Sequence, residues 1–202
     1  MNHLLSKIGS YPFEKLNLLH KDIKPSKEII NLSIGEPKLN ADSKVLDILN
    51  KETNSFSNYP PMNAVPELSE AYRQYLKNHF GIENVAEDEV CLVAGTREGT
   101  FSIIQALFNK ENVKEKPYVV MPNPFYQIYG GATTLAGGEA KFLDCPEEDN
   151  FQPDLDSLKS EDWQKCQILV LCSPNNPTGS VLPLSKLKNI LDLAEKYDFY
   201  VV

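Results

Sequence analysis

Apolar residues are spaced differently in two parts of the chain. Residues 1–66 are rich in Pro, Asn, Ser and Lys and contain only short apolar runs, whereas from residue 67 onward apolar runs alternate with segments of helical periodicity. The first pattern predicts an extended arm with a short helix, and the second predicts strands that alternate with helices. We therefore expect an N-terminal arm with part of a small domain in residues 1–66, and the first part of a large domain in residues 67–202.

Helical periodicity is clearest in two segments of the larger part. In residues 67–81, Leu68 and Tyr72 fall on one apolar stripe that ends near Gly81. This pattern predicts an amphipathic helix that is closed by a glycine. Residues 183–197 also carry their apolar residues on one face, which predicts a crossover helix between two strands.

Five apolar runs predict strands, with helices between them. This alternation predicts an α/β fold, with a mostly parallel sheet and helices on both faces. The runs LVLC and YVV are apolar throughout, so we expect both of their faces to be buried. The sheet is expected to be incomplete, because the chain ends inside an apolar run. The five runs are EVCLVAG (89–95), PYVVM (117–121), EAKFLD (139–144), CQILVLC (166–172) and FYVV (199–202).

Charge and cysteine spacing exclude several classes of protein. The net charge of −8 disfavours nucleic acids and anionic membrane surfaces as partners. No run approaches the roughly 18 apolar residues of a membrane helix, and residues 1–10 lack the apolar core of a signal peptide. We expect a cytoplasmic protein that binds neither nucleic acid nor membrane. The four cysteines lack the paired spacing of a metal site, so we expect reduced core residues and no metal: Cys91, Cys145, Cys166 and Cys172.

The motif AGTREG (94–99) follows a predicted strand and opens a helix. The amides of Gly95, Thr96 and Arg97 and the positive end of the helix dipole are suited to hold a phosphate. A structural alternative stays open, because such a turn also needs a glycine and a capping threonine. The motif is neither GxGxxG nor a P-loop, so it does not indicate a dinucleotide or a nucleoside triphosphate.

Two further motifs follow predicted strands, where parallel sheets bind ligands. In NPFYQIYGG (123–131), Phe125, Tyr126 and Tyr129 are suited either to stack on a planar ring or to fill the core. In SPNNPTG (173–179), two prolines and a glycine fix a turn that projects Asn176. Such a rigid turn is more than a connection requires, so it favours a binding role.

Two upstream motifs, LSIGEP (32–37) and NYPP (58–61), each contain one candidate residue. Gly35 lets a ligand approach the backbone, and Tyr59 offers a phenol hydrogen bond to an anion. Structural roles are equally compatible with either residue taken alone.

Taken in this order, these motifs resemble the class I and II aminotransferases, fold-type I enzymes that depend on pyridoxal 5′-phosphate (PLP). The resemblance covers nearly the whole chain. It implies PLP as the cofactor, amino acids and 2-oxo acids as substrates, and a homodimer for the full-length protein. Residues 67–202 would then be the first part of the PLP-binding large domain.

The resemblance also implies roles for the cofactor-binding residues. The backbone amides of Thr96 and Arg97 would hold the phosphate of PLP, and Tyr59 would reach the phosphate bound in the other subunit of the dimer. Tyr126 would stack on the pyridine ring. Asn176 would hydrogen-bond to the ring hydroxyl.

For the substrate, the resemblance implies that Gly35 lies near the carboxylate and that Tyr11 lines the site. The family also needs a lysine that bonds covalently to PLP, a carboxylate beside the pyridine nitrogen, and two arginines for the phosphate and the substrate. We expect all four beyond Val202. The chain would then supply binding residues but no catalytic residue, and it would be inactive alone.

Within the family, YPFEKL (11–16) and CSPNNPTGSVLPL (172–184) look most like enzymes that exchange an amino group between N-succinyl-LL-2,6-diaminopimelate and 2-oxoglutarate in lysine biosynthesis. Ala64 stands where the family usually has glycine, which removes no functional group. Two alternatives stay open. One is another aminotransferase or a β-lyase on the same scaffold, and the other is a truncated, non-catalytic fragment that binds a ligand or dimerises.

Overall fold

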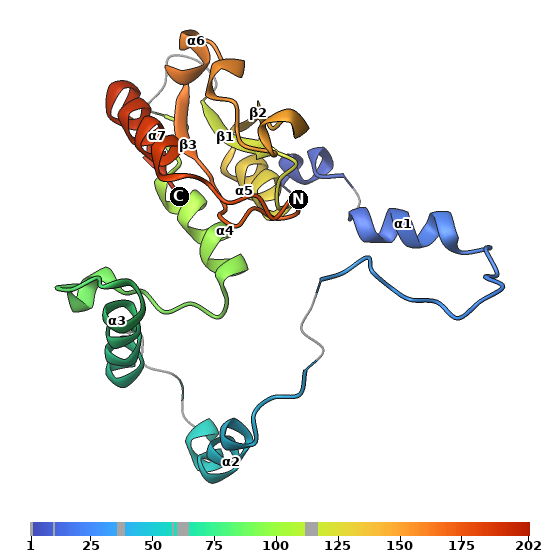
Figure 1. Cartoon of the computed structure of the whole chain (residues 1–202), viewed down its shortest axis with the longest axis vertical. Coiled ribbons are helices and arrows are strands. Elements are labelled where there is room, and N and C mark those ends of the chain that lie inside the picture. Colours follow the sequence, from blue (N-terminus) through green and yellow to red (C-terminus); the bar gives the residue numbers. More distant parts are fainter. Residues whose placement is uncertain (1, 10, 36–38, 58, 60–64, 112–116) are drawn as a thin grey trace. The chain divides into compact units, whose positions relative to one another are not determined.

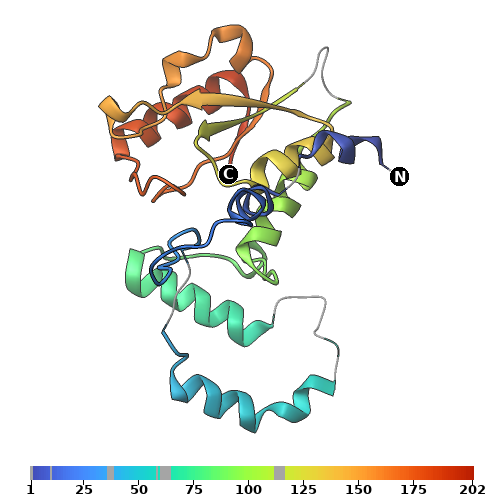
Figure 2. The same ribbon diagram turned by 90° about the vertical axis from the view of Figure 1, so that its right-hand side faces the viewer.

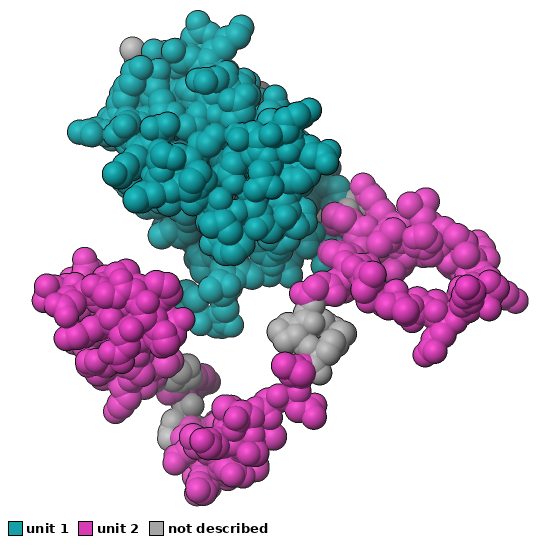
Figure 3. Space-filling model, viewed as in Figure 1, with its two compact units in different colours: residues 1–11, 93–202 teal, residues 12–92 magenta. Residues whose placement is uncertain are grey.

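The computed structural model describes residues 2–9, 11–35, 39–57, 59, 65–111 and 117–202 (Figures 1 and 2). The chain forms two compact units (Figure 3). Unit 1 consists of Met1–Tyr11 and Val93–Val202, and unit 2 consists of Pro12–Leu92. The domain boundary expected at residues 66/67 stays a prediction.

Unit 1 contains a sheet of four parallel strands, in the order β2-β1-β3-β4 (Figure 1). Helices connect the strands, as parallel neighbours require. The α/β class and four of the five predicted strands are therefore confirmed. The strands are β1 (Tyr118–Asn123), β2 (Glu139–Asp144), β3 (Cys166–Leu169) and β4 (Tyr200–Val201). The α-helices of unit 1 are α4 (Thr96–Leu107), α5 (Ile128–Ala136), α6 (Ser160–Trp163) and α7 (Leu184–Tyr197). Short 3-10 helices lie at His3–Lys7, Glu147–Asp149 and Leu155–Ser157.

Strand β1 is buried on both of its faces. Val119 and Met121 belong to one apolar cluster, which includes Ile104 of α4 and residues of α5. Val120 belongs to a second cluster, which includes Ile190 of α7. Because successive strand residues point to opposite faces, α4 and α5 cover one face of the sheet and α7 covers the other. These five side chains are fully buried, and each contributes about 1.5–3 kcal/mol to folding.

The run 89–95, predicted as a strand, does not form one. A 3-10 helix at Glu87–Glu89 is followed by irregular backbone, and Cys91 and Val93 are exposed. A strand needs a neighbour to pair with its N–H and C=O groups. Within the part of the chain that the structure describes, no strand pairs with this run. Its apolar character alone therefore gave a wrong prediction.

The predicted burial of the last strand is also wrong. Tyr200 and Val201 are 58% and 37% exposed. In the run LVLC, Leu169 and Val170 are buried as expected, but Leu171 and Cys172 are only half-buried. Strand β3 lies between two strands, while β4 is at the edge of the four-stranded sheet. Helices cover a sheet least at its edge, so the side chains of an apolar edge strand stay partly exposed to solvent.

Unit 2 is helical. Helix α3 confirms the amphipathic helix expected at residues 67–81, and it ends at Gly81 in the left-handed conformation. Of the residues described in unit 2, only Ser69 is buried. The helices of unit 2 are α1 (Pro12–His20), α2 (Ser43–Lys51) and α3 (Pro66–Phe80), with 3-10 helices at Thr53–Ser57 and Glu87–Glu89. Among the described helices of both units, none is long and apolar enough to cross a membrane.

Candidate functional site

Two loops with predicted binding residues follow adjacent strands of the sheet. Strands β1 and β3 are parallel neighbours, and the amide of Val170 donates to the carbonyl of Val120 (2.9 Å) just beyond β3. Both strands therefore end at the same edge, where α/β folds bind ligands. Tyr126 follows β1 and Asn176 follows β3, so the topology brings their loops to one edge.

The loop after β1 separates its three aromatic residues into two groups. The ring of Phe125 stacks on Phe142 of β2 at a centroid distance of 5.3 Å, and Tyr129 is buried at the start of α5. Tyr126 is half-buried, and its ring meets Tyr129 edge-on at 5.8 Å and 89°. The core alternative thus describes Tyr129, whereas Phe125 and Tyr126 are both half-buried against the first apolar cluster.

The turn at 173–179 is closed by its own hydrogen bonds. The amide of Asn175 donates to the carbonyl of Ser180 (2.8 Å), and the amide of Gly179 donates to the carbonyl of Asn175 (2.7 Å). Asn175 Nδ2 also donates to Thr178 Oγ1 (2.9 Å). Gly179 has φ +73°, a conformation that favours glycine. These bonds fix the turn, and they leave the side chain of Asn176 exposed.

A buried glutamine ties this turn to the loop after β2. Gln152 Nε2 donates to Ser180 Oγ and to the carbonyl of Val181. The side chain is 7% exposed, and a small pocket lies beside it between Phe151 and Asn175. Sequence reasoning missed Gln152, because an isolated glutamine in a polar segment carries no local signal of burial.

Helix α4 begins at Thr96, so its first turn presents the predicted phosphate donors. The amide of Gly99 donates to the carbonyl of Gly95 (2.9 Å), and the earlier amides have no acceptor within the helix. Thr96 and Arg97 are exposed. Gly95, not Thr96, occupies the N-cap position. The structural alternative, in which Thr96 caps the helix, is therefore wrong. In Figures 1 and 2, α4 begins on the lower side of unit 1, where the turn after β3 also lies.

The phenol of Tyr129 has a strongly perturbed pKa. Burial, followed by contact with Cys172 and then the nearby Tyr126, raises this pKa to about 12. The group is therefore a protonated hydrogen-bond donor throughout the neutral range.

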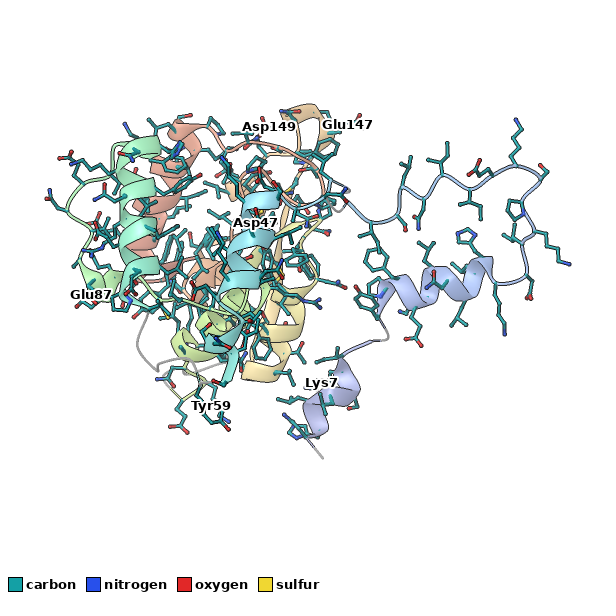
Figure 4. All side chains as sticks on the ribbon, turned by 90° about the horizontal axis from the view of Figure 1, so that it is seen from below. Lys7, Asp47, Tyr59, Glu87, Glu147 and Asp149 are labelled. Carbon is teal, nitrogen blue, oxygen red and sulfur yellow. The ribbon has the colours of Figure 1, made fainter. Side chains whose placement is uncertain are left out.

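The remaining predicted residues lie on exposed backbone. Gly35 and Tyr59 belong to unit 2, and the ring of Tyr59 is 98% exposed (Figure 4). Tyr11 belongs to unit 1 and is 47% exposed. Their roles toward the phosphate and the substrate stay predictions. Ala64 lies outside the described residues.

The four cysteines are free, as expected, but only Cys166 is a core residue. Burial raises the pKa of its thiol to about 12, which makes it an inert apolar group. Across the described ranges, no group of three His, Cys, Asp or Glu side chains is arranged to hold a metal ion.

The chain matches the family described as aminotransferase class I and II over residues 27–202. It is 40% identical to an aminotransferase of Neisseria meningitidis Z2491, whose crystal structure gives a TM-score of 0.90 and is aligned with 100% of this chain and 51% of that one. It is also similar to the LL-diaminopimelate aminotransferase of Natranaerobius thermophilus, at 29% identity over 89% of this chain and 46% of the relative. The aspartate aminotransferase of Pyrococcus horikoshii is 28% identical over 93% of this chain and 47% of the relative.

The chain spans about half the length of the curated relatives it matches. Its similarity to solved aminotransferase structures confirms the fold-type I class. The cofactor of these enzymes is PLP. Because the match extends over residues 27–202, the chain belongs to the class I and II aminotransferase family.

Proposed function

We propose that the chain is the PLP-binding part of an aminotransferase that exchanges an amino group between N-succinyl-LL-2,6-diaminopimelate and 2-oxoglutarate. The observation that carries this proposal is the sheet edge at which the loop of Tyr126 and the turn of Asn176 follow adjacent parallel strands. The full-length protein is proposed to act in the cytoplasm, in lysine biosynthesis.

The groups that unit 1 offers fit PLP, which has a phosphate, a pyridine ring and a ring hydroxyl. The first-turn amides of α4, at Thr96 and Arg97, suit a phosphate. Tyr126 offers an aromatic ring that is only half-buried. The exposed amide of Asn176 can donate to a hydroxyl oxygen. The phosphate, the ring face and the ring hydroxyl of the cofactor thus each have a chemically suitable partner in this unit.

When bound, PLP supplies an electron-withdrawing ring that lets the α-carbon of an amino acid lose a proton. The residues of this chain bind and orient. The amides of Thr96 and Arg97, at the positive end of the α4 dipole, would stabilise the negative charge of the phosphate. Tyr126 would contact the face of the ring and Asn176 its hydroxyl, which would lower the entropy cost of reaching a reactive geometry.

Roles are also proposed for two residues of unit 2. Gly35 would accommodate the substrate carboxylate, and Tyr59 would reach the phosphate of the partner subunit in a homodimer. Support for the second role comes from the 98% exposure of Tyr59, which leaves its hydroxyl free to meet a group outside unit 2. Tyr11 would line the substrate site.

We also propose that the 202-residue chain is inactive by itself. Lys186 donates to Asp149 Oδ2 (3.3 Å) and to the carbonyl of Pro153 (3.2 Å), and Lys188 and Lys196 are exposed. An amine that donates to a carboxylate and a carbonyl, or that faces solvent, is not oriented for attack on a bound cofactor. These lysines of α7 are therefore unsuited to bond to the cofactor.

The substrate is tested by assaying the full-length protein with PLP, 2-oxoglutarate and three amino donors. We expect kcat/KM for N-succinyl-LL-2,6-diaminopimelate to exceed that for LL-diaminopimelate and for aspartate by about 10-fold or more, since a site that pairs the succinyl carboxylate rejects donors without it. In a parallel arm, the 202-residue chain is incubated with PLP and reduced with borohydride. Mass spectrometry should find no specific pyridoxyl group on any lysine.

A preference for LL-diaminopimelate or aspartate would instead assign the donor named for the relatives. Elimination of a sulfur group from cystathionine would assign a β-lyase. A specific pyridoxyl-lysine in the 202-residue chain would overturn its proposed inactivity.

A further inference from the structure

Two buried oxygen atoms near the turn at 173–179 have no hydrogen-bond donor among the described residues. They are Gln152 Oε1 and Asn175 Oδ1, and the side chain of Gln152 is 7% exposed. A buried acceptor without a donor is costly, so buried carbonyl oxygens of folded proteins nearly always have a partner. These two atoms therefore indicate a donor other than the described side chains.

The other contacts of each amide fix which of its atoms needs this donor. Gln152 Nε2 donates to Ser180 Oγ and to the carbonyl of Val181 (2.9 Å). Because a carbonyl can only accept, the nitrogen must face Val181 and Oε1 must face away from it. Asn175 Nδ2 donates to Thr178 Oγ1 (2.9 Å), which leaves Oδ1 as the atom of this amide that needs a partner.

The pocket beside these amides has the size of one water molecule. Its volume is about 10 Å³, and a single water needs roughly 10–15 Å³. Asn175 and Ser180 line it, together with Phe151 and Pro153, the two chain neighbours of Gln152. Ser180 Oγ already accepts from Gln152 Nε2, so the hydrogen of this hydroxyl is available to a further acceptor.

We infer that this pocket binds one structural water molecule, which donates its two hydrogens to Gln152 Oε1 and Asn175 Oδ1 and accepts the hydrogen of Ser180 Oγ. The water then has three partners, as buried waters usually do. It joins the loop after β2 to the turn that carries Asn176. Its consequence for PLP rests on the proposed function: Gln152 and Asn175 are positioning residues that act through the water on Asn176.

The site is tested first in a crystal structure of the full-length protein without PLP, at a resolution that shows ordered water. We expect one water at about 2.5–3.0 Å from both Gln152 Oε1 and Asn175 Oδ1. A pocket without water would overturn the inference. A protein side chain that donates to these two oxygens in place of the water would overturn it as well.

Two substitutions of Asn175 separate the water from the packing around it. Asn175→Asp keeps an oxygen at the position of Oδ1, and the hydroxyl of Thr178 can donate to the second oxygen, so the water should remain. Asn175→Leu removes the acceptor at similar side-chain size, so the water should be lost. The control Asn189→Leu, on the exposed side of α7, should keep the water. A water retained in Asn175→Leu, or lost in Asn175→Asp, would contradict the assigned contact.

The effect of the water on the turn is measured in solution by amide hydrogen exchange without PLP. The amide of Gly179 donates to the carbonyl of Asn175 (2.7 Å) and reports closure of the turn. Asn175→Leu should speed its exchange by roughly 2- to 10-fold, the effect of losing one hydrogen bond. Asn175→Asp and Asn189→Leu should not. With PLP bound, Asn175→Leu should also reduce the visible circular dichroism of the cofactor, which reports a fixed ring.

Unchanged exchange in Asn175→Leu would overturn the role of the water in closing the turn. Faster exchange with unchanged dichroism would overturn the positioning role, since the water would then serve the fold alone. If the wild-type protein bound no PLP, the proposed function would fail. The crystal and exchange results, obtained without PLP, would still decide the water site, and should Asn175→Leu not fold, the wild-type structure decides it.

Discussion

The two units differ in what holds their candidate binding residues in place. In unit 1, Tyr126 and Asn176 lie on loops anchored to a sheet whose two central strands are mostly buried. In unit 2, Gly35 and Tyr59 are exposed, and Ser69 is the only buried residue among those described. Packing within unit 1 therefore determines where its binding groups lie, whereas unit 2 supplies groups whose positions its own packing does not determine.

The apolar residues of the two units show the same difference. Helix α2 is amphipathic, yet Val45, Ile48 and Leu49 are all about half exposed or more. Ile190 of α7 is fully buried against the sheet. An apolar stripe thus predicts a helix in either unit, but only burial converts the stripe into stability.

The largest expected effect comes from comparing one isoleucine of each unit. Ile190→Ala should lower the free energy of unfolding by about 2–5 kcal/mol, because it leaves a cavity in the second cluster. Ile48→Ala, on α2, should change it by less than about 0.5 kcal/mol. Urea unfolding can be followed by the fluorescence of Trp163, the single tryptophan, which belongs to the same cluster as Ile190. Equal effects of the two substitutions would contradict the proposed difference in packing between the two units.

A smaller effect is expected for the two glutamines that donate hydrogen bonds. Gln152→Ala removes the bonds to Ser180 and Val181 and should cost about 1–3 kcal/mol, because buried acceptors lose their donor. Gln74→Ala removes an exposed bond to Glu70 on α3 (2.9 Å) and should cost less than about 0.5 kcal/mol. Urea midpoints of both variants measure the difference. If Gln152→Ala cost as little as Gln74→Ala, the stability of the turn at 173–179 would not depend on the hydrogen bonds of Gln152.

The smallest effect concerns ion pairs and pH. Lys141 and Asp162 are 2.8 Å apart in unit 1. Their hydrogen bond raises the pKa of Lys141 and lowers the pKa of Asp162. Stability from Asp162 should therefore be lost as pH falls through its lowered pKa, and stability from Lys141 as pH rises through its raised pKa. At neutral pH, Asp162→Asn should cost about 0.2–1 kcal/mol.

The matched substitution in unit 2 is Glu83→Gln, which removes an exposed pair with Lys77 at 3.4 Å. Both side chains of this pair are more than half exposed, so the expected cost is close to zero. Thermal unfolding across a pH series measures both variants. If the difference in melting temperature between the wild type and Asp162→Asn did not change with pH, the pair of Lys141 and Asp162 would contribute nothing to stability.

The sequence predicted the helices and strands that pack or pair with other elements inside unit 1. The spacing of residues 183–197 predicts α7, and the apolar runs at 117–121 and 166–172 predict β1 and β3. The run at 89–95 failed because strand formation depends on a neighbour that local spacing does not reveal.

The candidate site was only partly predictable for a related reason. Tyr126 and Asn176 follow strands, so strand order was enough to bring their loops to one edge. The hydrogen bond between Gln152 and Ser180 joins residues 28 positions apart. Such contacts depend on three-dimensional packing, and no short motif encodes them.

The burial of β1 on both faces leaves open how its pairing with β2 is chosen. A slip by one residue would exchange Val119 and Val120 between the two clusters with little change in buried apolar area, so hydrophobicity does not select the register. Pro122 does discriminate, because it has no amide hydrogen to donate. Its backbone faces β3, as that of Val120 does, beyond the last β1–β3 pair of Val120 with Leu169. A slip by one residue would turn Pro122 toward β2, where the ladder continues to Asn123 and Asp144 and needs a donor. The alignment of β1, and with it the position of Tyr126, is thus favoured by a proline at the end of the strand.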